Sequence, residues 1–178
     1  MADPVLILAG PPGAGKTTTA RLLAARSDRA VHLEADSFFH FIRAGYLEPS
    51  KPESHEQNRT VMHAVAAAAC SYADAGYFTI IEGIISPRWF FEPLRDALRA
   101  AGHAAAYAVL LAPLEVCISR AENRDASRLT DTAVIEQLWR DFTDLGPLAR
   151  HVIDSHHENA VGIAKQVTER LESGLLDV

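Results

Sequence analysis

The stretch of sequence that decides the fold runs Val5-Leu6-Ile7-Leu8-Ala9-Gly10-Pro11-Pro12-Gly13-Ala14-Gly15-Lys16-Thr17. Its first four residues are apolar, and a short apolar run that ends at a glycine-rich segment predicts a buried strand. Its second half fits the pattern G-x-x-x-x-G-K-[ST], and a helix is expected from about Gly15 to Arg26. The chain therefore opens with a glycine-rich turn between a strand and a helix.

This turn has the composition of a phosphate-binding loop. Glycines allow backbone N–H groups to point inward around phosphate oxygens, and the N-terminus of the following helix adds its positive end. Lys16 is expected to reach the β- and γ-phosphates, and the hydroxyl of Thr17 to hold Mg²⁺. The alternative is a glycine-rich turn that binds nothing. The residues expected to bind the nucleotide are Gly10, Gly13, Ala14, Gly15, Lys16, Thr17 and Thr18.

Length and composition favour one globular domain over residues 1–178. The chain has 178 residues, of which 48% are hydrophobic and 22% charged, enough to build a core. The net charge of −6 argues against a general affinity for nucleic acid, because such proteins carry a basic face. No apolar run approaches the ~18 residues of a membrane span. We expect no nucleic-acid or membrane partner, and a monomer or small homo-oligomer.

The two cysteines, Cys70 and Cys117, sit among apolar residues and are too few for a disulfide framework. The N-terminus also lacks the basic segment of an export signal. Both observations favour a cytoplasmic location.

Apolar runs of strand length alternate with segments of helical period along the whole chain. This alternation is typical of an α/β fold, in which helices cover a parallel sheet. Glycines and prolines separate the elements, and no internal repeat or linker supports a second domain. The further strands are expected at Val31–Leu33, Phe78–Ile81, Ala106–Leu111 and His151–Ile153. Further helices are expected at about 37–44, 54–75, 87–101, 113–124 and 131–142, with a last helix that ends at about Leu171.

A single-domain chain that opens with this loop resembles the small P-loop kinases. That group includes the nucleoside monophosphate, shikimate and gluconate kinases and chloramphenicol phosphotransferase. The resemblance implies a P-loop NTPase fold with a five-stranded parallel sheet in the order 2-3-1-4-5. It also implies a helical acceptor-binding segment, here residues 37–59, and a short arginine-bearing lid, here residues 124–131.

Asp36 follows the second strand, at the end of the sheet where α/β proteins gather ligands. In the kinases that the chain resembles, an aspartate at this place contacts the acceptor hydroxyl. Asp36 is therefore expected to bind that hydroxyl and act as the general base. Glu34 is the second candidate for this role. The alternative for Asp36 is a helix N-cap before Ser37.

Glu82 closes the third strand in Ile80-Ile81-Glu82-Gly83. If the sheet order is as implied, this carboxylate lies beside the loop and can hold a Mg²⁺-bound water or a substrate hydroxyl, as the resemblance suggests. A strand-end acid that faces solvent is the alternative. Thr17 and Glu82 are thus the expected metal residues.

Three arginines at spacing four, Arg120, Arg124 and Arg128, share one face while a helix continues. By the resemblance, Arg120 stacks on adenine, and Arg124 and Arg128 are catalytic lid arginines that contact the transferred phosphate. Planar guanidinium groups suit the charge that spreads over phosphoryl oxygens. An ordinary solvated helix face is the alternative.

Two stretches rich in aromatic residues, 38–46 and 88–91, are expected to face each other over the loop. Together they would form an acceptor pocket in which an arginine meets an anionic group. Most aromatic residues in such stretches belong to the core, which is the alternative for each of them. The acceptor-binding candidates are Phe39, His40, Arg43, Arg59, Glu82 and Arg88.

These features predict a phosphotransferase that moves the γ-phosphate of Mg-ATP to a hydroxyl of a small molecule. ATP is favoured because the Asn-Lys-x-Asp signature of GTPases is absent. An antibiotic, a sugar and a nucleoside-like compound all remain open as acceptors, and antibiotic resistance is one open role. Two alternatives are a kinase of a sugar nucleotide resembling the zeta toxins, and a nucleotide-gated regulatory ATPase without an acceptor.

Overall fold

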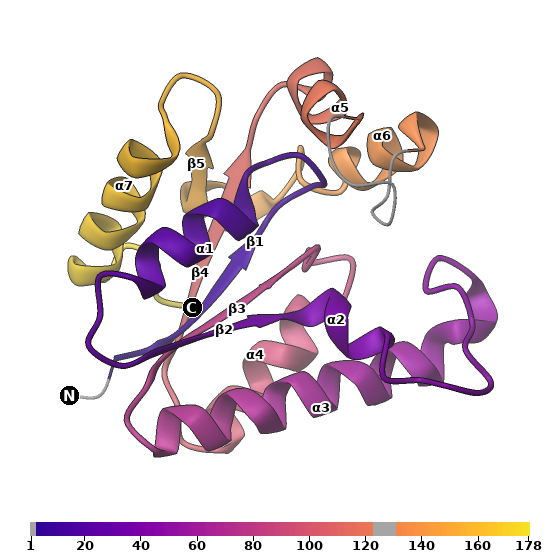
Figure 1. Ribbon diagram of the computed structural model, residues 1–178, viewed down its shortest axis with the longest axis horizontal. Coiled ribbons are helices and arrows are strands. Elements are labelled where there is room, and N and C mark those ends of the chain that lie inside the picture. The colour runs from indigo at the N-terminus through magenta and orange to yellow at the C-terminus, as the bar shows by residue number, and fades with distance from the viewer. Residues whose placement is uncertain (1–2, 123–130) are drawn as a thin grey trace.

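The computed structural model describes residues 3–122 and 131–178. Its centre is a parallel sheet of five strands in the order β2-β3-β1-β4-β5 (Figure 1). The expected strands and their order are therefore confirmed. The strands are β1 (Val5–Ala9), β2 (Ala30–Glu34), β3 (Phe78–Gly83), β4 (Ala105–Leu111) and β5 (Val152–Asp154).

Helices cover both faces of the sheet, which confirms the α/β arrangement (Figure 1). On one face lie α1 (Lys16–Ala24) and α7 (Ala160–Glu172), and on the other lie α3 (His55–Asp74) and α4 (Phe91–Ala100). The remaining helices are α2 (Ala35–Phe39), α5 (Leu114–Glu122) and α6 (Thr132–Arg140), with short 3₁₀ turns at Pro52–Ser54 and Gly146–His151. No helix in the described ranges is long and apolar enough to cross a membrane.

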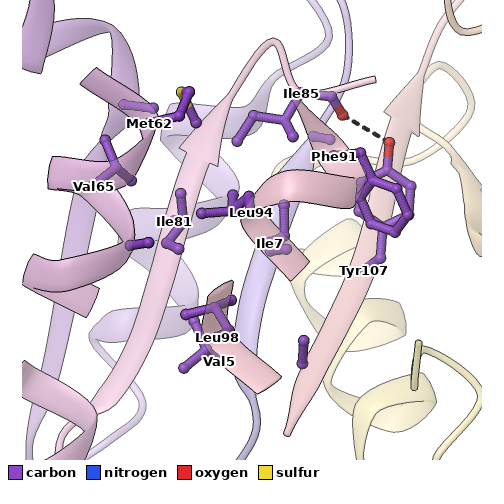
Figure 2. Close-up of a cluster of buried hydrophobic side chains, with 14 of the residues drawn as sticks. Val5, Ile7, Met62, Val65, Ile81, Ile85, Phe91, Leu94, Leu98 and Tyr107 are labelled. Carbon is purple, nitrogen blue, oxygen red and sulfur yellow. Dashed lines mark hydrogen bonds between the residues drawn. The ribbon is translucent and has the colours of Figure 1, made fainter. Parts of the chain in front are cut away.

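The larger hydrophobic core lies between the sheet and the helices α3 and α4 (Figure 2). Ile7 and Ile81 of the sheet meet Val65 of α3 and Leu94 of α4 there. The fully buried hydroxyl of Tyr107 donates a hydrogen bond of 2.8 Å to the carbonyl of Ile85. Burial raises the pKa of Tyr107, so its hydroxyl remains a donor. This bond fixes the chain just after β3, at the end of the sheet that carries the site.

A second core lies on the opposite face, under α1 and α7. Leu6 and Leu8 of β1 point into it, whereas Val5 and Ile7 point into the first core. Because alternate residues of β1 are buried on opposite faces, the strand must be apolar throughout. That is the physical reason for the uninterrupted run that opens the sequence.

The C-terminal residues complete the edge of the sheet beside β4, since β5 pairs only with Val109–Leu111. The amide of Tyr107 donates to Leu176 over 2.8 Å, and the amide of Val178 donates to Ala105 over 3.1 Å. These bonds satisfy backbone groups that an edge strand would otherwise leave to solvent or to another chain. The sequence interpretation did not include this pairing.

The structure corrects two helix boundaries near the site. The helix after β2 starts at Ala35 and ends at Phe39, so it is shorter and earlier than the expected 37–44. The helix after β3 starts at Phe91 instead of 87, because residues 86–90 form a tight turn in which the amides of Trp89 and Phe91 both bond to the carbonyl of Ser86. Phe90 takes a left-handed φ of 60° to close this turn.

Candidate functional site

The glycine-rich loop between β1 and α1 is held in shape by its neighbours β4 and α5. A side chain at Gly10 would overlap the carbonyl oxygen of Leu110, and one at Gly13 would overlap that of Cys117. Both glycines also have left-handed backbones, with φ of 144° and 81°. The two glycines therefore let the loop curl against β4 and let α5 approach it closely.

Lys16 lies across this loop instead of extending into solvent. Its side chain is buried, with 6% of the residue exposed, and Nζ donates a hydrogen bond of 3.0 Å to the carbonyl of Pro11. The amide of Ala14 also donates to Pro11, over 3.3 Å. The loop is thus closed around its own lysine, at the N-terminus of α1, as a phosphate cradle requires.

Thr17 and Glu82 join the loop to the neighbouring strand. Oγ1 of Thr17 donates a hydrogen bond of 3.1 Å to Oε2 of Glu82. Glu82 is 7% exposed, so the alternative of a solvent-facing acid is wrong. The contact follows from the sheet order, because β3 lies beside β1 with Leu8 opposite Glu82. The two predicted metal residues are therefore brought together.

A third side chain, which the sequence interpretation missed, completes this group. Nε2 of His32 lies 3.2 Å from Oε2 of Glu82. Burial would raise the pKa of Glu82, but the hydrogen bond with His32 and the charge of Lys16 together hold that pKa below its ordinary value. Glu82 is therefore a carboxylate at neutral pH. The sequence holds only a weak signal for this contact. His32 lies on β2, a different strand from Glu82, and its only local clue is that it stands two residues before Glu34.

The ligand atoms of His32, Glu34 and Glu82 lie within 4.8 Å of one another. Glu34 stands directly opposite Glu82 in the pairing of β2 with β3. It also faces the guanidinium of Arg21 at 3.7 Å. Carboxylate oxygens at this edge suit a hard divalent cation such as Mg²⁺. The predicted magnesium role of Thr17 and Glu82 fits these donors.

Asp36 lies in the first turn of α2, directly after β2, and its side chain is exposed. The N-cap of α2 is Glu34, so the alternative of Asp36 as an N-cap is wrong. Its place at the carboxyl end of the sheet agrees with the expected catalytic role, which stays a prediction.

The predicted arginines are only partly within the described residues. Arg120 in α5 is half-buried, and its Nη1 donates to the carbonyl of Ser155 over 3.1 Å. This bond places Arg120 beside the connection that follows β5. Arg120 also lies one turn of α5 after Cys117, whose backbone packs against Gly13 of the phosphate-binding loop. Arg124 and Arg128, with nearly all of the predicted lid 124–131, lie outside the described residues. Asp131, the last lid residue, caps α6 by accepting from the amides of Ala133 and Val134.

The acceptor-binding candidates lie in different surroundings. Phe39 is buried and contacts Trp89, with ring centroids 6.5 Å apart. Arg59 projects from α3 and pairs with Glu56 over 2.8 Å at the surface. The side chains of His40, Arg43 and Arg88 are exposed. Their acceptor-binding roles stay predictions.

The two aromatic stretches of the sequence do meet, through the contact of Phe39 with Trp89. His55 at the start of α3, outside both stretches, stacks on Phe90 with centroids 5.9 Å apart. Between the start of α3 and the turn after β3 lies a cavity of about 430 Å³. We call it the α3–α4 cavity, and its lining is residues 49–52, His55, Asn58, residues 87–90 and Pro93.

A glycine-rich loop closed by its own lysine, beside a threonine–glutamate pair at the carboxyl end of a 2-3-1-4-5 sheet, defines a P-loop protein of the α/β class. Residues 5–145 of the sequence match an AAA domain family. The chain belongs to that family, which confirms the P-loop resemblance. None of the curated proteins matches the sequence.

Solved structures of similar fold include three small proteins of nearly the same length. A sugar kinase from Janibacter sp. HTCC2649 is 21% identical, with 96% of this chain and 95% of that chain covered and a TM-score of 0.71. The tunicamycin resistance protein of Deinococcus radiodurans is 21% identical over 99% and 98%, with a TM-score of 0.66. Shikimate kinase from Acinetobacter baumannii, solved with shikimate, is 23% identical over 97% and 94%, with a TM-score of 0.60. These likenesses establish the shared fold.

Proposed function

We propose that this protein is an ATP-dependent phosphotransferase that transfers the γ-phosphate of Mg-ATP to a hydroxyl group of a small molecule. The observation that carries the proposal is the hydrogen bond between Thr17 and Glu82. It joins the phosphate-binding loop to a buried carboxylate at the carboxyl end of the sheet. Asp36 follows the adjacent strand β2 at the same end, so the proposed nucleotide-binding and acceptor-binding residues both lie at the carboxyl end of the sheet.

The residues of the loop fit a nucleotide triphosphate. Its turn precedes the N-terminus of α1, where free amides and the helix dipole favour anions. A side chain at Gly15 would meet nothing within 4 Å, so the face of the loop at this residue is open. Lys16 already holds its ammonium group over the loop, bonded to the carbonyl of Pro11. The donor set of Thr17 and Glu82 is of the oxygen type that Mg²⁺ prefers.

Each residue has a separate task in the proposed reaction. Bound Mg-ATP would supply the phosphoryl group and the charge neutralisation that its transfer needs. Lys16 and the loop amides bind the phosphates, and Thr17 with Glu82 orients the cation. Asp36 accepts the proton of the acceptor hydroxyl and aligns its oxygen for attack. Arg120 borders the nucleotide from α5, and Arg124 and Arg128 are proposed to contact the transferred phosphate.

The proteins of similar fold support a small-molecule acceptor. They include a sugar kinase and a shikimate kinase, and sugars and shikimate are small hydroxylated compounds. A resistance protein with the same fold agrees with an antibiotic as the acceptor class. With identities near 20%, the acceptor must be found by experiment.

The test is a screen of hydroxylated metabolites and antibiotics for acceptor-dependent release of ADP, with mass spectrometry of the product. The expected result is a compound that raises ADP release above basal hydrolysis and gains one phosphoryl group. The same assay on Lys16→Ala should show neither. ATP hydrolysis that no acceptor stimulates would instead favour a regulatory ATPase and would contradict the proposal.

A further inference from the structure

His32, Glu34 and Glu82 gather on one face of the sheet because of the strand register. His32 and Glu34 are two residues apart on β2, so their side chains project from the same face. Glu34 stands directly opposite Glu82 on β3, which places the third side chain on that face as well. Thr17 and Arg21 of α1 contact Glu82 and Glu34, respectively. The cluster therefore lies between the sheet and α1 (Figure 1).

The spacing of the three side chains fits a single metal ion. Nε2 of His32 lies 3.2 Å from Oε2 of Glu82, and the ligand atoms of all three residues lie within 4.8 Å of one another. In a tetrahedral site with metal–ligand bonds of about 2.0 to 2.2 Å, neighbouring ligand atoms are about 3.3 to 3.6 Å apart. His32 and Glu82 are already close to this separation, and a small rotation of the Glu34 side chain brings in the third ligand.

The cluster opens to solvent at Glu34. The side chain of Glu34 is 30% exposed, whereas those of His32 and Glu82 are mostly covered. Arg21 faces Glu34 at 3.7 Å, but its own side chain is 68% exposed and can turn away into solvent. An ion pair this exposed contributes little to stability. A cation that enters at Glu34 therefore displaces a weak contact and does not disturb the core.

The imidazole of His32 determines which cation suits the cluster. Mg²⁺ prefers oxygen ligands and retains several of its waters, whereas imidazole nitrogen is a preferred ligand of zinc. One histidine and two carboxylates supply three protein ligands for Zn²⁺ and leave the fourth position to water. On binding, Oε2 of Glu82 exchanges its hydrogen bond with His32 for a bond to the ion, and the imidazole carries its proton on Nδ1.

We propose that His32, Glu34 and Glu82 bind one Zn²⁺ ion without nucleotide. This ion differs from the Mg²⁺ expected with ATP at Thr17 and Glu82, because it needs the imidazole of His32 and no phosphate. The two ions share Glu82, so each excludes the other. That zinc thereby inhibits phosphoryl transfer rests on the proposed function.

Binding is tested by isothermal titration calorimetry of the whole chain, free of any histidine tag, with ZnCl₂ and with MgCl₂ in the absence of nucleotide. We expect one tight zinc site per chain, with an affinity at least about 100-fold above that for Mg²⁺, because only zinc gains from the nitrogen ligand. Zinc X-ray absorption of the same sample should show an imidazole ligand. Equal affinity for the two ions overturns the proposal, as does a zinc ion without an imidazole ligand.

Variants at two of the ligands link the zinc to this cluster. His32→Gln removes the nitrogen ligand but keeps a side chain that can donate to Glu82, and its zinc affinity should fall about 100-fold. Glu34→Gln, at the exposed edge of the cluster, should lose about tenfold or more and provides the same test if His32→Gln does not fold. His157→Gln is the matched control, because exposed His157 lies 3.8 Å from Asp154 and is a rival surface ligand. Loss of zinc binding in His157→Gln, with none in the other two variants, overturns the assignment.

A zinc titration of ADP release at fixed Mg-ATP separates this inference from the proposed function. Half-inhibition of the wild type should need less zinc than that of His32→Gln, while zinc bound to ATP itself affects both proteins alike. Equal half-inhibition would contradict the sharing of Glu82. Zinc binding that depends on His32, with no ADP release stimulated by any acceptor, supports the zinc site and contradicts the phosphotransferase. Acceptor-dependent ADP release without tight zinc binding supports the phosphotransferase and overturns the zinc site.

Discussion

The hydroxyl of Thr17 donates a hydrogen bond to Oε2 of Glu82 over 3.1 Å, which joins the first turn of α1 to the end of β3. In this bond the hydroxyl proton points toward the carboxylate. The lone pairs of the Thr17 oxygen therefore remain available to coordinate a cation. His32 contacts the same Oε2 from β2. The orientation of the proposed cation ligands is thus fixed by contacts within the protein itself.

Removing the hydroxyl of Thr17 should weaken the use of Mg²⁺. In Thr17→Ala the cation loses a ligand and Glu82 loses a hydrogen bond, so the Mg²⁺ concentration for half-maximal ADP release should rise about 10- to 100-fold. Thr17→Ser, which keeps the hydroxyl, is the matched control and should stay near the wild type. A magnesium titration of both variants provides the measurement, and identical curves would contradict the metal role.

Loss of the Lys16 ammonium group should weaken nucleotide binding and slow turnover. Lys16→Ala removes the positive charge that now lies over the loop, so turnover should fall by about 10²- to 10³-fold, the scale seen when one electrostatic donor is deleted. Calorimetry with Mg-ATP should register weaker binding at the same time. Lys165→Ala, on the exposed face of α7, carries the same charge change and should bind ATP normally.

Asp36→Asn separates nucleotide binding from transfer to the acceptor. The amide keeps the size of the side chain but cannot take the hydroxyl proton, so acceptor-dependent turnover should drop about 10²-fold or more while ATP affinity is kept. Asp28→Asn is the matched control, in the exposed connection between α1 and β2 at the opposite end of the sheet. Near-normal turnover of Asp36→Asn would refute the role of this residue as the base.

The sheet could be predicted because short stretches of the sequence identify its strands. The run Val5–Ala9 is apolar throughout, as a central strand buried on both faces requires, and the loop motif that follows implies the strand order through a known resemblance. The positions of Lys16, Thr17 and Glu82 follow from that order. The closeness of Thr17 to Glu82 was therefore predictable from the sequence together with that resemblance.

Features that depend on pairing between distant segments could not be predicted. The contact of His32 with Glu82 depends on the register of β2 against β3, which places Glu34 opposite Glu82 and His32 opposite Ile80. The orientation of the buried Asn58 amide depends on the fold of residues 49–54 around it. Neither pattern has a local signature in the chain.

Two of the three left-handed glycines of the loop, Gly13 and Gly15, should differ in their tolerance of a side chain. Gly15→Ala enters open space and carries only the backbone strain of a left-handed alanine, so it should lower the free energy of unfolding by about 1 to 2 kcal/mol. Gly13→Ala adds a collision with the backbone of Cys117, which brings the expected loss to about 2 to 5 kcal/mol. Urea unfolding of the two variants measures both values. Equal losses would show that α5 can move away from the loop without cost.

His151 is a buried histidine whose surroundings oppose its protonation. It is 0% exposed, its Nδ1 lies 3.0 Å from the carbonyl of Tyr107, and Nε of Arg150 donates to its Nε2 over 3.2 Å. Burial first, and then the charges of Arg150 and Arg170, lower the pKa of His151, although the Tyr107 carbonyl and Asp177 act in the opposite direction. The folded protein therefore holds the neutral ring, with its proton on Nδ1.

This lowered pKa should make the protein less stable on mild acidification. Below about pH 6.5 the unfolded chain binds a proton at this histidine that the folded chain does not, so the free energy of unfolding falls as pH falls toward the folded pKa. One such group contributes a slope of at most about 1.4 kcal/mol per pH unit. His151→Asn, whose amide can replace the Nδ1 donor, should lose this contribution, whereas His63→Asn on the exposed face of α3 should keep it. Urea unfolding between pH 7.5 and 5 (about the titration range of histidine) measures the slopes, and equal slopes in wild type and His151→Asn would show that His151 does not resist protonation in the folded protein.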